Sequence, residues 1–294
     1  KAQPESDSFE TSDIKDVCGD YPALLGLDLG RLEWADLNID GIDIDNIVNA
    51  AKVHYKRGGL ITISWHANNP VTNKNVFDVS NPQTVELILS DTKARDEYMK
   101  RLQKVADIID LIRDQKERKI PIIFRPFHEE NQGFWWSVKN TTSENYKALW
   151  HITFDYLVKE RKLKNLIWAY SPYNIRNSEK YEINYPGDDY VDIVCYEKYQ
   201  GEGGSENFIE DVKDGLFALS EFAKKHKKIP AMSECGFSSI KEDNWWTQTL
   251  LPSIEGASIA FVLVWRNYTE NPQYYAPFKG QKSESDFVKL YKSK

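Results

Sequence analysis

The sequence is poor in cysteine and has no long apolar run. Its three cysteines, Cys18, Cys195 and Cys235, match no metal-site spacing, and an odd number leaves at least one of them unpaired. We expect small, buried apolar residues at these positions, and whether any two of them pair stays open. No stretch reaches the ~20 consecutive apolar residues of a membrane-spanning helix, which excludes a membrane-embedded protein.

The chain also lacks the basic stripe that a nucleic-acid-binding protein carries. It has 38 basic and 45 acidic residues, a formal net charge of −7, and a mean hydropathy of −0.59. This balance argues against a polyanionic partner. The polar run KAQPESDSFETSD at the start holds no apolar segment of a signal or transit peptide. We therefore expect residues 1–20 to be an N-terminal extension, with no export signal inside this sequence.

Aromatic residues, by contrast, are abundant. There are 9 tryptophans, 16 tyrosines and 13 phenylalanines, more than a core of this size needs. The flat C–H faces of sugars stack on aromatic rings, so surplus Trp and Tyr suit a carbohydrate cleft, although packing accounts for most aromatic residues in any protein. Composition favours a carbohydrate ligand without establishing one.

Apolar runs that end in Asp, His, Pro or Gly alternate with helical patterns along the chain. This alternation, with near-continuous apolar strands, predicts a parallel sheet covered by helices on both faces. The predicted strands are residues 23–28, 60–66, 120–129, 165–172, 191–199, 229–236 and 259–267, with a weak eighth within 31–43. The predicted helices are residues 44–57, 91–118, 143–161, 207–227 and 244–254.

Eight strands would close a (β/α)8 TIM barrel, whereas six or seven would allow an open, doubly wound sheet. The polar residues favour the barrel, because each predicted strand ends in side chains able to do chemistry, as at the C-terminal face of such barrels. An open sheet would concentrate them at one switch point. No linker or repeat divides the chain, so we expect a single catalytic domain over residues 21–294.

Two glutamates at predicted strand ends can serve as a catalytic pair. Glu129 ends the run IPIIFRPFHE, and Glu234 lies in the later run IPAMSECG. A glycosidase needs one carboxyl group to protonate the leaving oxygen and a second to attack the anomeric carbon or activate water, about 5–5.5 Å apart when configuration is retained. The pair alone is a weak signal, because carboxylates at a rim are usually solvated or salt-bridged.

The neighbours of the two glutamates give them different environments. Glu129 lies in the aromatic run FHEENQGFWW, where desolvation would raise its pKa toward that of a general acid. Glu234 directly follows an apolar strand, and Arg125 and Tyr199 are available to keep it ionised. The sequence therefore predicts distinct roles for the two carboxyl groups.

These runs resemble glycoside hydrolase family 26, whose best-known members are β-mannanases. The run RPFHEENQGFWWS is similar to the acid/base signature of that family, and SECGF is similar to its nucleophile signature. Four further segments resemble family motifs in matching order: SWHANNP (64–70), LIWAYSPYN (166–174), DIVCYEKY (192–199) and VLVWRN (262–267).

The resemblance implies a retaining double displacement on β-1,4-mannan, on a (β/α)8 barrel and without a metal or other cofactor. Glu129 would be the acid/base after the fourth strand, and Glu234 the nucleophile after the seventh. Tyr199 would hydrogen-bond the nucleophile, and Trp265 would be an aromatic floor for the sugar. The predicted substrate-binding residues are His66, Arg125, His128, Trp135, Trp136, Tyr173, Tyr199, Trp265 and Arg266.

The chain departs from the family pattern next to these residues. Glu197 stands where an aspartate is more usual, and Glu130 directly follows the acid. We expect Glu130 to be a rim salt-bridge partner without a catalytic duty. A metal-dependent barrel hydrolase is disfavoured, because such enzymes usually need an HxH pair on an early strand and the sequence has none.

Several alternatives stay open. The chain could be a β-1,4-xylanase or a mixed-linkage β-glucanase of the same family, or a catalytically inactive carbohydrate-binding barrel. The sequence does not distinguish an enzyme that cleaves inside the polysaccharide from one that releases mannobiose from its end. The difference depends on loops whose shape the sequence does not predict, residues 64–91, 174–189 and 200–207. We expect a monomer that acts outside the cytoplasm, since a polysaccharide is too large to enter a cell.

Overall fold

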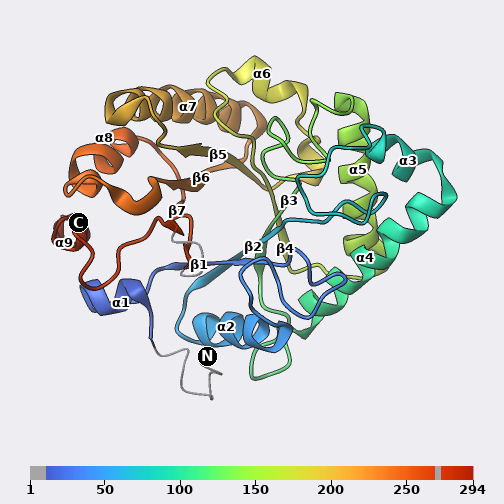
Figure 1. Ribbon diagram of the computed structural model, residues 1–294, viewed down its shortest axis with the longest axis horizontal. Helices are drawn as coiled ribbons and strands as arrows, with labels where there is room; N and C mark the ends of the chain where they lie inside the picture. The colour runs from blue at the N-terminus through green and yellow to red at the C-terminus, as the bar shows by residue number, and fades with distance from the viewer. Residues whose placement is uncertain (1–10, 269–272, 294) are drawn as a thin grey trace.

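The computed structural model describes residues 11–268 and 273–293 of the chain. It shows a parallel sheet curved into a barrel and surrounded by helices (Figure 1). Adjacent strands of the sheet are neighbours in the sequence. The predicted α/β barrel is confirmed.

The described residues contribute seven strands to the barrel, each parallel to its neighbours. They are β1 (Leu24–Asp28), β2 (Leu60–Trp65), β3 (Ile122–Pro126), β4 (Leu166–Tyr170), β5 (Ile193–Tyr199), β6 (Ile229–Gly236) and β7 (Val262–Val264). A separate antiparallel pair follows, β8 (Asn267–Tyr268) and β9 (Gln273–Tyr274).

The weak eighth strand predicted within residues 31–43 is wrong. The side-chain oxygen of Asn38 accepts hydrogen bonds from the backbone N–H of Asp40 (2.8 Å) and of Ile42 (2.9 Å). Local bonding of this kind by asparagine favours a turn over a strand. The strand count therefore shifts by one: Glu129 follows the third described strand and Glu234 lies at the end of the sixth, not the fourth and seventh.

The described part of the sheet is nearly closed into a ring. Its two edge strands, β1 and β7, lie side by side but do not pair. A largely apolar groove of about 710 Å³ separates them. Leu263 reaches across it, since a Cβ atom on Gly26 would lie 3.5 Å from Leu263 Cδ2.

Helices cover the outside of the barrel (Figure 1). They are α1 (Asp13–Cys18), α2 (Ile44–Lys56), α3 (Thr84–Ser90), α4 (Thr92–Leu111), α5 (Ser143–Phe154), α6 (Ser178–Ile183), α7 (Gly204–His226), α8 (Leu251–Ile254) and α9 (Glu284–Lys292). Three helices begin at a capping residue. The side chains of Asp43, Asp91 and Thr142 each accept a hydrogen bond from the backbone N–H of the residue three positions later, at the starts of α2, α4 and α5. Two π-helical segments, Asp155–Glu160 and Trp246–Leu250, adjoin α5 and α8. No described helix has the length and apolar character needed to span a bilayer.

The core has two parts. Residues such as Ile123, Ile193 and Cys195 fill the barrel interior, and a larger aromatic-rich cluster lies between the strands and the helices. Cys195 and Cys235 are buried, as expected, whereas Cys18 is half-buried, and all three are free thiols. Trp168 and Tyr170 are buried and belong to the larger cluster.

Candidate active site

The segment after β3 is held in an unusual backbone conformation that presents Glu129. Phe127 and Glu129 both have a φ of 49°, in the left-handed region that costs free energy for residues other than glycine. The backbone N–H of Glu129 donates to the carbonyl of Ser171 (2.7 Å), and the Tyr146 hydroxyl donates to the carbonyl of Phe127 (3.1 Å). Phe127 is thereby buried in the core, and Glu129 stays partly exposed at the rim.

Glu234 is held by two side chains that the sequence predicted as its partners. Arg125 Nη2 donates to Glu234 Oε1 (2.7 Å), and the Tyr199 hydroxyl donates to Glu234 Oε2 (2.8 Å). Glu234 is 3% exposed, so these bonds operate away from bulk water. Both oxygens of the carboxylate are thereby fixed.

The two glutamates meet across the mouth of the barrel. One carboxylate oxygen each of Glu129, Glu197 and Glu234 lies within 4.8 Å of the other two. Retaining glycosidases need a carboxyl separation of about 5–5.5 Å, whereas inverting ones need about 6.5–9.5 Å to admit water. The geometry fits retention.

Glu129 has the environment of a general acid. Burial, and then the negative charge of Glu234, raise the pKa of Glu129 to about 8. It accepts no bond from Arg125, which contacts the other two carboxylates. At neutral pH Glu129 therefore holds a proton that it can donate.

Glu197 is a third, fully buried carboxylate. Arg125 Nη1 (2.7 Å) and the Ser233 hydroxyl (2.7 Å) both donate to Glu197 Oε1. Burial, followed by the charge of Glu234, raises the pKa of Glu197 well above its usual value. Three carboxylates this close resemble a cation site, but the guanidinium of Arg125 already supplies a positive charge to two of them.

A row of hydrogen-bonded side chains runs from Asp28 at the end of β1 to His128, the residue before Glu129. Asp28 Oδ2 bonds His66 Nδ1 (2.7 Å) and accepts from the Ser64 hydroxyl (2.6 Å), and His66 Nε2 lies 3.1 Å from His128 Nε2. Burial opposes the charge on His66, but Asp28 raises the pKa of His66 above its usual value. Burial and the charge of His66 lower the pKa of His128 well below its own. His66 is therefore the charged member of the pair.

The predicted substrate-binding residues Trp135, Trp136, Trp265 and Arg266 form two groups, one buried and one partly exposed. Trp135 and Trp136 are buried beneath the rim, where their ring N–H groups donate to the carbonyls of Ala67 and His128. Trp265 is half-buried, 5.9 Å from His66 between ring centres. Arg266 lies over Trp265 and forms an ion pair with Asp40. Trp265 thus lies beside His66, while the two tryptophans support the loop that carries Glu129.

Tyr173 lies on the same rim. Its ring is nearly parallel to that of Tyr199, at an angle of 13° and a centroid distance of 6.5 Å. Its backbone N–H donates to Asn131 Oδ1 (3.0 Å), which ties the end of β4 to the segment after Glu129. Tyr173 is half-buried, as a side chain lining a cleft would be.

The rim salt bridge predicted for Glu130 is wrong. Glu130 is fully buried and has no ion pair within the described ranges. The Tyr170 hydroxyl (2.9 Å) and Asn184 Nδ2 (3.3 Å) both donate to Glu130 Oε1. Burial raises the pKa of Glu130 to about 7. Glu130 points into the helix layer behind the rim.

The predictions overlooked Asp28 and Ser233, which position His66 and Glu197. A signal was present for Asp28, because it ends the apolar run ALLGLD at the same rim as the other strand ends. Three further histidines lie in helices and make contacts away from this rim: His54 is buried, His151 bonds the Pro186 carbonyl and His226 bonds Asp188.

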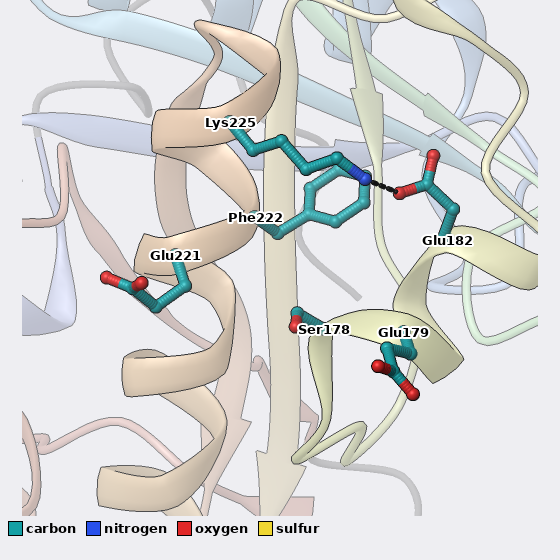
Figure 2. A pocket seen from close by; sticks show the side chains of 6 residues that line it. All are labelled: Ser178, Glu179, Glu182, Glu221, Phe222 and Lys225. Atoms are coloured by element: carbon teal, nitrogen blue, oxygen red, sulfur yellow. Dashed lines mark hydrogen bonds and ion pairs between the residues drawn. The ribbon is translucent and has the colours of Figure 1, made fainter.

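A second hollow, of about 480 Å³, lies between α6 and α7 on the outside of the barrel (Figure 2). Its lining residues are Ser178, Glu179, Glu182, Glu221, Phe222 and Lys225. Lys225 and His226 both bond Glu182, at 2.6 Å and 3.2 Å, so the carboxylate of Glu182 in this hollow already has partners. None of the predicted site residues lines it, and we place the chemistry at the barrel mouth.

Comparison with known proteins agrees with the geometry. The chain is 29% identical to a mannan endo-1,4-beta-mannosidase of Bifidobacterium adolescentis, over 96% of this chain and 30% of that protein. It is 32% identical to one of Bacillus subtilis, over 67% of this chain and 56% of that protein. The chain thus spans about a third to a half of the length of these relatives.

Solved structures give the same relationship. A family 26 beta-mannanase from Bacteroides ovatus superposes with a TM-score of 0.93 at 37% identity, covering 96% of this chain and 82% of that one. A modular endo-beta-1,4-mannanase from Cellulomonas fimi gives 0.85 at 27% identity, covering 96% and 65%. The model of glycosyl hydrolase family 26 matches residues 2–285. The chain therefore belongs to glycosyl hydrolase family 26.

Proposed function

We propose that this protein hydrolyses β-1,4-mannosidic bonds of mannan-type polysaccharides by a retaining double displacement. The observation that carries the proposal is the pair Glu129 and Glu234, with oxygens within 4.8 Å across the barrel mouth and only Glu234 bonded to an arginine. The names of the relatives in Bifidobacterium and Bacillus support mannan as the substrate.

In the first step the carboxylate of Glu234 attacks the anomeric carbon. Glu129 gives its proton to the glycosidic oxygen, and the bond to the departing sugar breaks, which leaves a glycosyl ester on Glu234. Arg125 and Tyr199 hold the nucleophile in position. The raised pKa of Glu129, about 8, keeps the acid protonated for this step.

In the second step water replaces Glu234 at the anomeric carbon. Ester formation removes the charge of Glu234, one of the causes that raise the pKa of Glu129, so this pKa falls. Glu129, now ionised, takes a proton from water as the oxygen attacks the anomeric carbon and the ester bond breaks. The sugar leaves with its original configuration, and both glutamates return to their starting states.

The substrate also bears on where the protein acts. A polysaccharide of this kind is too large to enter a cell, and we propose that the protein acts outside the cytoplasm. Immunodetection in cell fractions of the source organism tests this, and recovery only from the cytoplasmic fraction would contradict it.

Two assays test the proposed function. Release of reducing sugars from mannan, xylan and lichenan should be greatest with mannan, and greater activity on xylan or lichenan would overturn the substrate. Glu234→Ala should abolish turnover of every substrate, whereas Glu129→Ala should spare the first step, formation of the glycosyl ester, far better with substrates that have activated leaving groups than with mannan. Binding without hydrolysis by the unaltered protein would indicate an inactive barrel.

A further inference from the structure

We propose that Asn131 is a positioning residue, which holds the acid Glu129 in place relative to the nucleophile Glu234. The proposal rests on the proposed function, because it takes Glu129 to be the proton donor. Asn131 lies two residues after Glu129, in the segment between β3 and α5. Nothing in the two-step mechanism uses its side chain.

The position of the Glu129 carboxyl group depends on the backbone of this residue. Among the residues that the structure describes, none forms a hydrogen bond or an ion pair with that carboxyl group. The φ of Glu129 is 49°, a conformation that costs free energy in a residue other than glycine and persists only where neighbouring contacts enforce it. The contacts of the adjacent residues therefore decide where the acid lies.

Asn131 provides such a contact by using its side chain in place of a peptide group. Its Oδ1 accepts from the backbone N–H of Tyr173 (3.0 Å), and its Nδ2 donates to the carbonyl of Tyr173 (2.7 Å). These are the two groups through which a residue bonds a neighbouring strand in a parallel sheet. The orientation of the amide follows from them, because an N–H can only donate and a carbonyl can only accept.

These bonds continue the contact between β3 and β4 beyond the ends of both strands. The backbone N–H of Glu129 donates to the carbonyl of Ser171 (2.7 Å), and two residues later on each segment Asn131 bonds Tyr173. Two points of attachment fix the direction of the segment between them, whereas one point would let it pivot. The loss of the Asn131 side chain would therefore leave the strained backbone of Glu129 with less support.

On its other side Tyr173 leads to the nucleophile. It forms a parallel bridge with Glu197 of β5. Arg125 bonds the side chains of both Glu197 and Glu234, at 2.7 Å each. Asn131 thereby connects the loop that carries the acid with the strands that hold the nucleophile, and so helps to set the separation of the two carboxyl groups.

A purely structural role of Asn131 makes a different prediction. Loss of a bond that only stabilises the fold would affect all substrates alike. A residue that acts through the acid matters in the first step only where the leaving group needs a proton. A dinitrophenolate leaves without one, so kcat/KM for a dinitrophenyl glycoside, which reports this first step, should be spared. Its kcat should still fall, because hydrolysis of the ester needs Glu129 as the base.

Kinetic constants of substituted proteins separate these roles. They are measured with mannohexaose and with a dinitrophenyl β-mannobioside for the unaltered protein, Asn131→Ala and Asn131→Asp, and for Asn165→Ala as the control. Asn165 Nδ2 donates to the carbonyl of Ile120 (2.8 Å), so it connects the same two strands at the opposite end of the barrel. Urea unfolding of each protein shows that it is folded.

Asn131→Ala should lower kcat/KM about tenfold or more for mannohexaose and less than about twofold for the mannobioside. With the mannobioside, kcat and KM should fall together as the ester accumulates. Asn131→Asp has the same shape but presents a carboxylate oxygen to the Tyr173 carbonyl, so it should show the same split, and it decides the matter if Asn131→Ala does not fold. Asn165→Ala should change kcat/KM by the same factor for both substrates.

An equal loss with both substrates, no loss with either, or the same split in Asn165→Ala would overturn the role of Asn131. If the unaltered protein cleaves mannohexaose, the proposed function stands in each of these cases. The same measurements with xylohexaose and a dinitrophenyl β-xylobioside keep the test independent of the proposed substrate. The split with these xylosides, without cleavage of mannohexaose by the unaltered protein, would support the role and refute mannan as the substrate. No hydrolysis of any of the four compounds by the unaltered protein would overturn both.

Discussion

Asp28 shows how one buried carboxylate sets the charge of a neighbouring pair of imidazole rings. It bonds His66 Nδ1 (2.7 Å), Ser64 Oγ (2.6 Å) and the backbone N–H of Gly30 (2.6 Å), so its position is fully determined. The charge of Asp28 raises the pKa of His66 in spite of burial, and burial together with the charge of His66 lowers the pKa of His128. His66 thereby adds a positive charge beside Glu129 and Glu234.

Substituting Asp28→Asn should make activity more sensitive to pH. Burial, the largest cause, then lowers the pKa of His66 against only the weaker effects of the Glu234 and Glu129 charges, so we expect His66 to lose its proton near neutrality and to keep it under acid conditions. We expect kcat/KM to fall about tenfold or more at pH 7 and less at pH 5. Profiles of kcat/KM against pH check this, with exposed Asp189→Asn as the control. An equal loss at both pH values would show a purely structural role.

The predicted residues that the structure brings together at the rim have local signals in the sequence. Glu129 and Glu234 end apolar runs, and Arg125 and Tyr199 lie on strands that the parallel order brings beside Glu234. The burial of Glu130 had no such signal. It depends on Tyr170 and Asn184, 40 and 54 residues away, whose packing only the folded chain reveals.

At the scale of elements, α7 and β5 pack so closely that one position admits only glycine. A Cβ atom on Gly215 would lie 2.1 Å from the ring of Tyr196. The ring has little freedom to move, because the Tyr196 hydroxyl lies within hydrogen-bond distance of both the Asp211 carbonyl (2.7 Å) and Asn174 Oδ1 (2.8 Å).

Gly215→Ala should therefore destabilise the protein, although alanine favours helices. We expect the free energy of unfolding to fall by about 1–3 kcal/mol, the usual cost of overpacking, which outweighs a helix-propensity gain of about 1 kcal/mol. Urea unfolding measures the change. Gly201→Ala is the matched control, because no atom lies within 4 Å of its added Cβ. Equal stability of the two variants would contradict this account of the packing.

Helices and strands with a clear apolar pattern could be predicted from the sequence. Segments whose shape depends on side-chain hydrogen bonds could not. β3 is indicated by the apolar run IPIIF (120–124), and it is buried along its whole length. Residues 31–43 contain similar apolar residues, but Asn38 gathers two backbone N–H groups and turns the chain. The close approach of Gly215 to Tyr196 depends on two elements meeting, which no local pattern shows.

At the scale of the whole molecule, buried acids link stability to pH. The pKa of Glu130 is raised to about 7 by burial, so the folded state retains a proton that the unfolded chain releases near its ordinary value of 4.5. An acid whose pKa is higher in the folded than in the unfolded state stabilises the fold fully at pH values below its unfolded-state pKa. This stabilisation is lost as the pH rises through its folded-state pKa. Glu129 acts in the same direction, with a pKa of about 8.

Glu130→Gln should flatten this dependence. Glutamine carries no charge to release, so the variant avoids a loss on the order of 3 kcal/mol between pH 4.5 and pH 8. Urea unfolding at pH 5 and pH 8 compares the two proteins, and the difference between the two pH values should be smaller in the variant. The same difference in both proteins would mean that Glu130 does not hold the proton.

The barrel as a whole was predictable from the order of its strands, but its seam was not. The alternation of apolar runs and helical patterns indicates the parallel barrel. The groove between β1 and β7 lies where these two edge strands stand side by side without pairing. Closure of a sheet depends on strand pairing over the full circumference, which no single run of sequence encodes.

The central claim is that Glu234 forms the covalent bond and Glu129 assists it. Glu129→Ala, treated with a dinitrophenyl β-mannobioside, should accumulate the glycosyl ester, because the activated leaving group needs no acid while hydrolysis of the ester lacks its base. Mass spectrometry of the peptides then locates the added sugar. The account predicts the sugar on Glu234, and a sugar on Glu197, the neighbouring carboxylate that shares Arg125, would contradict it.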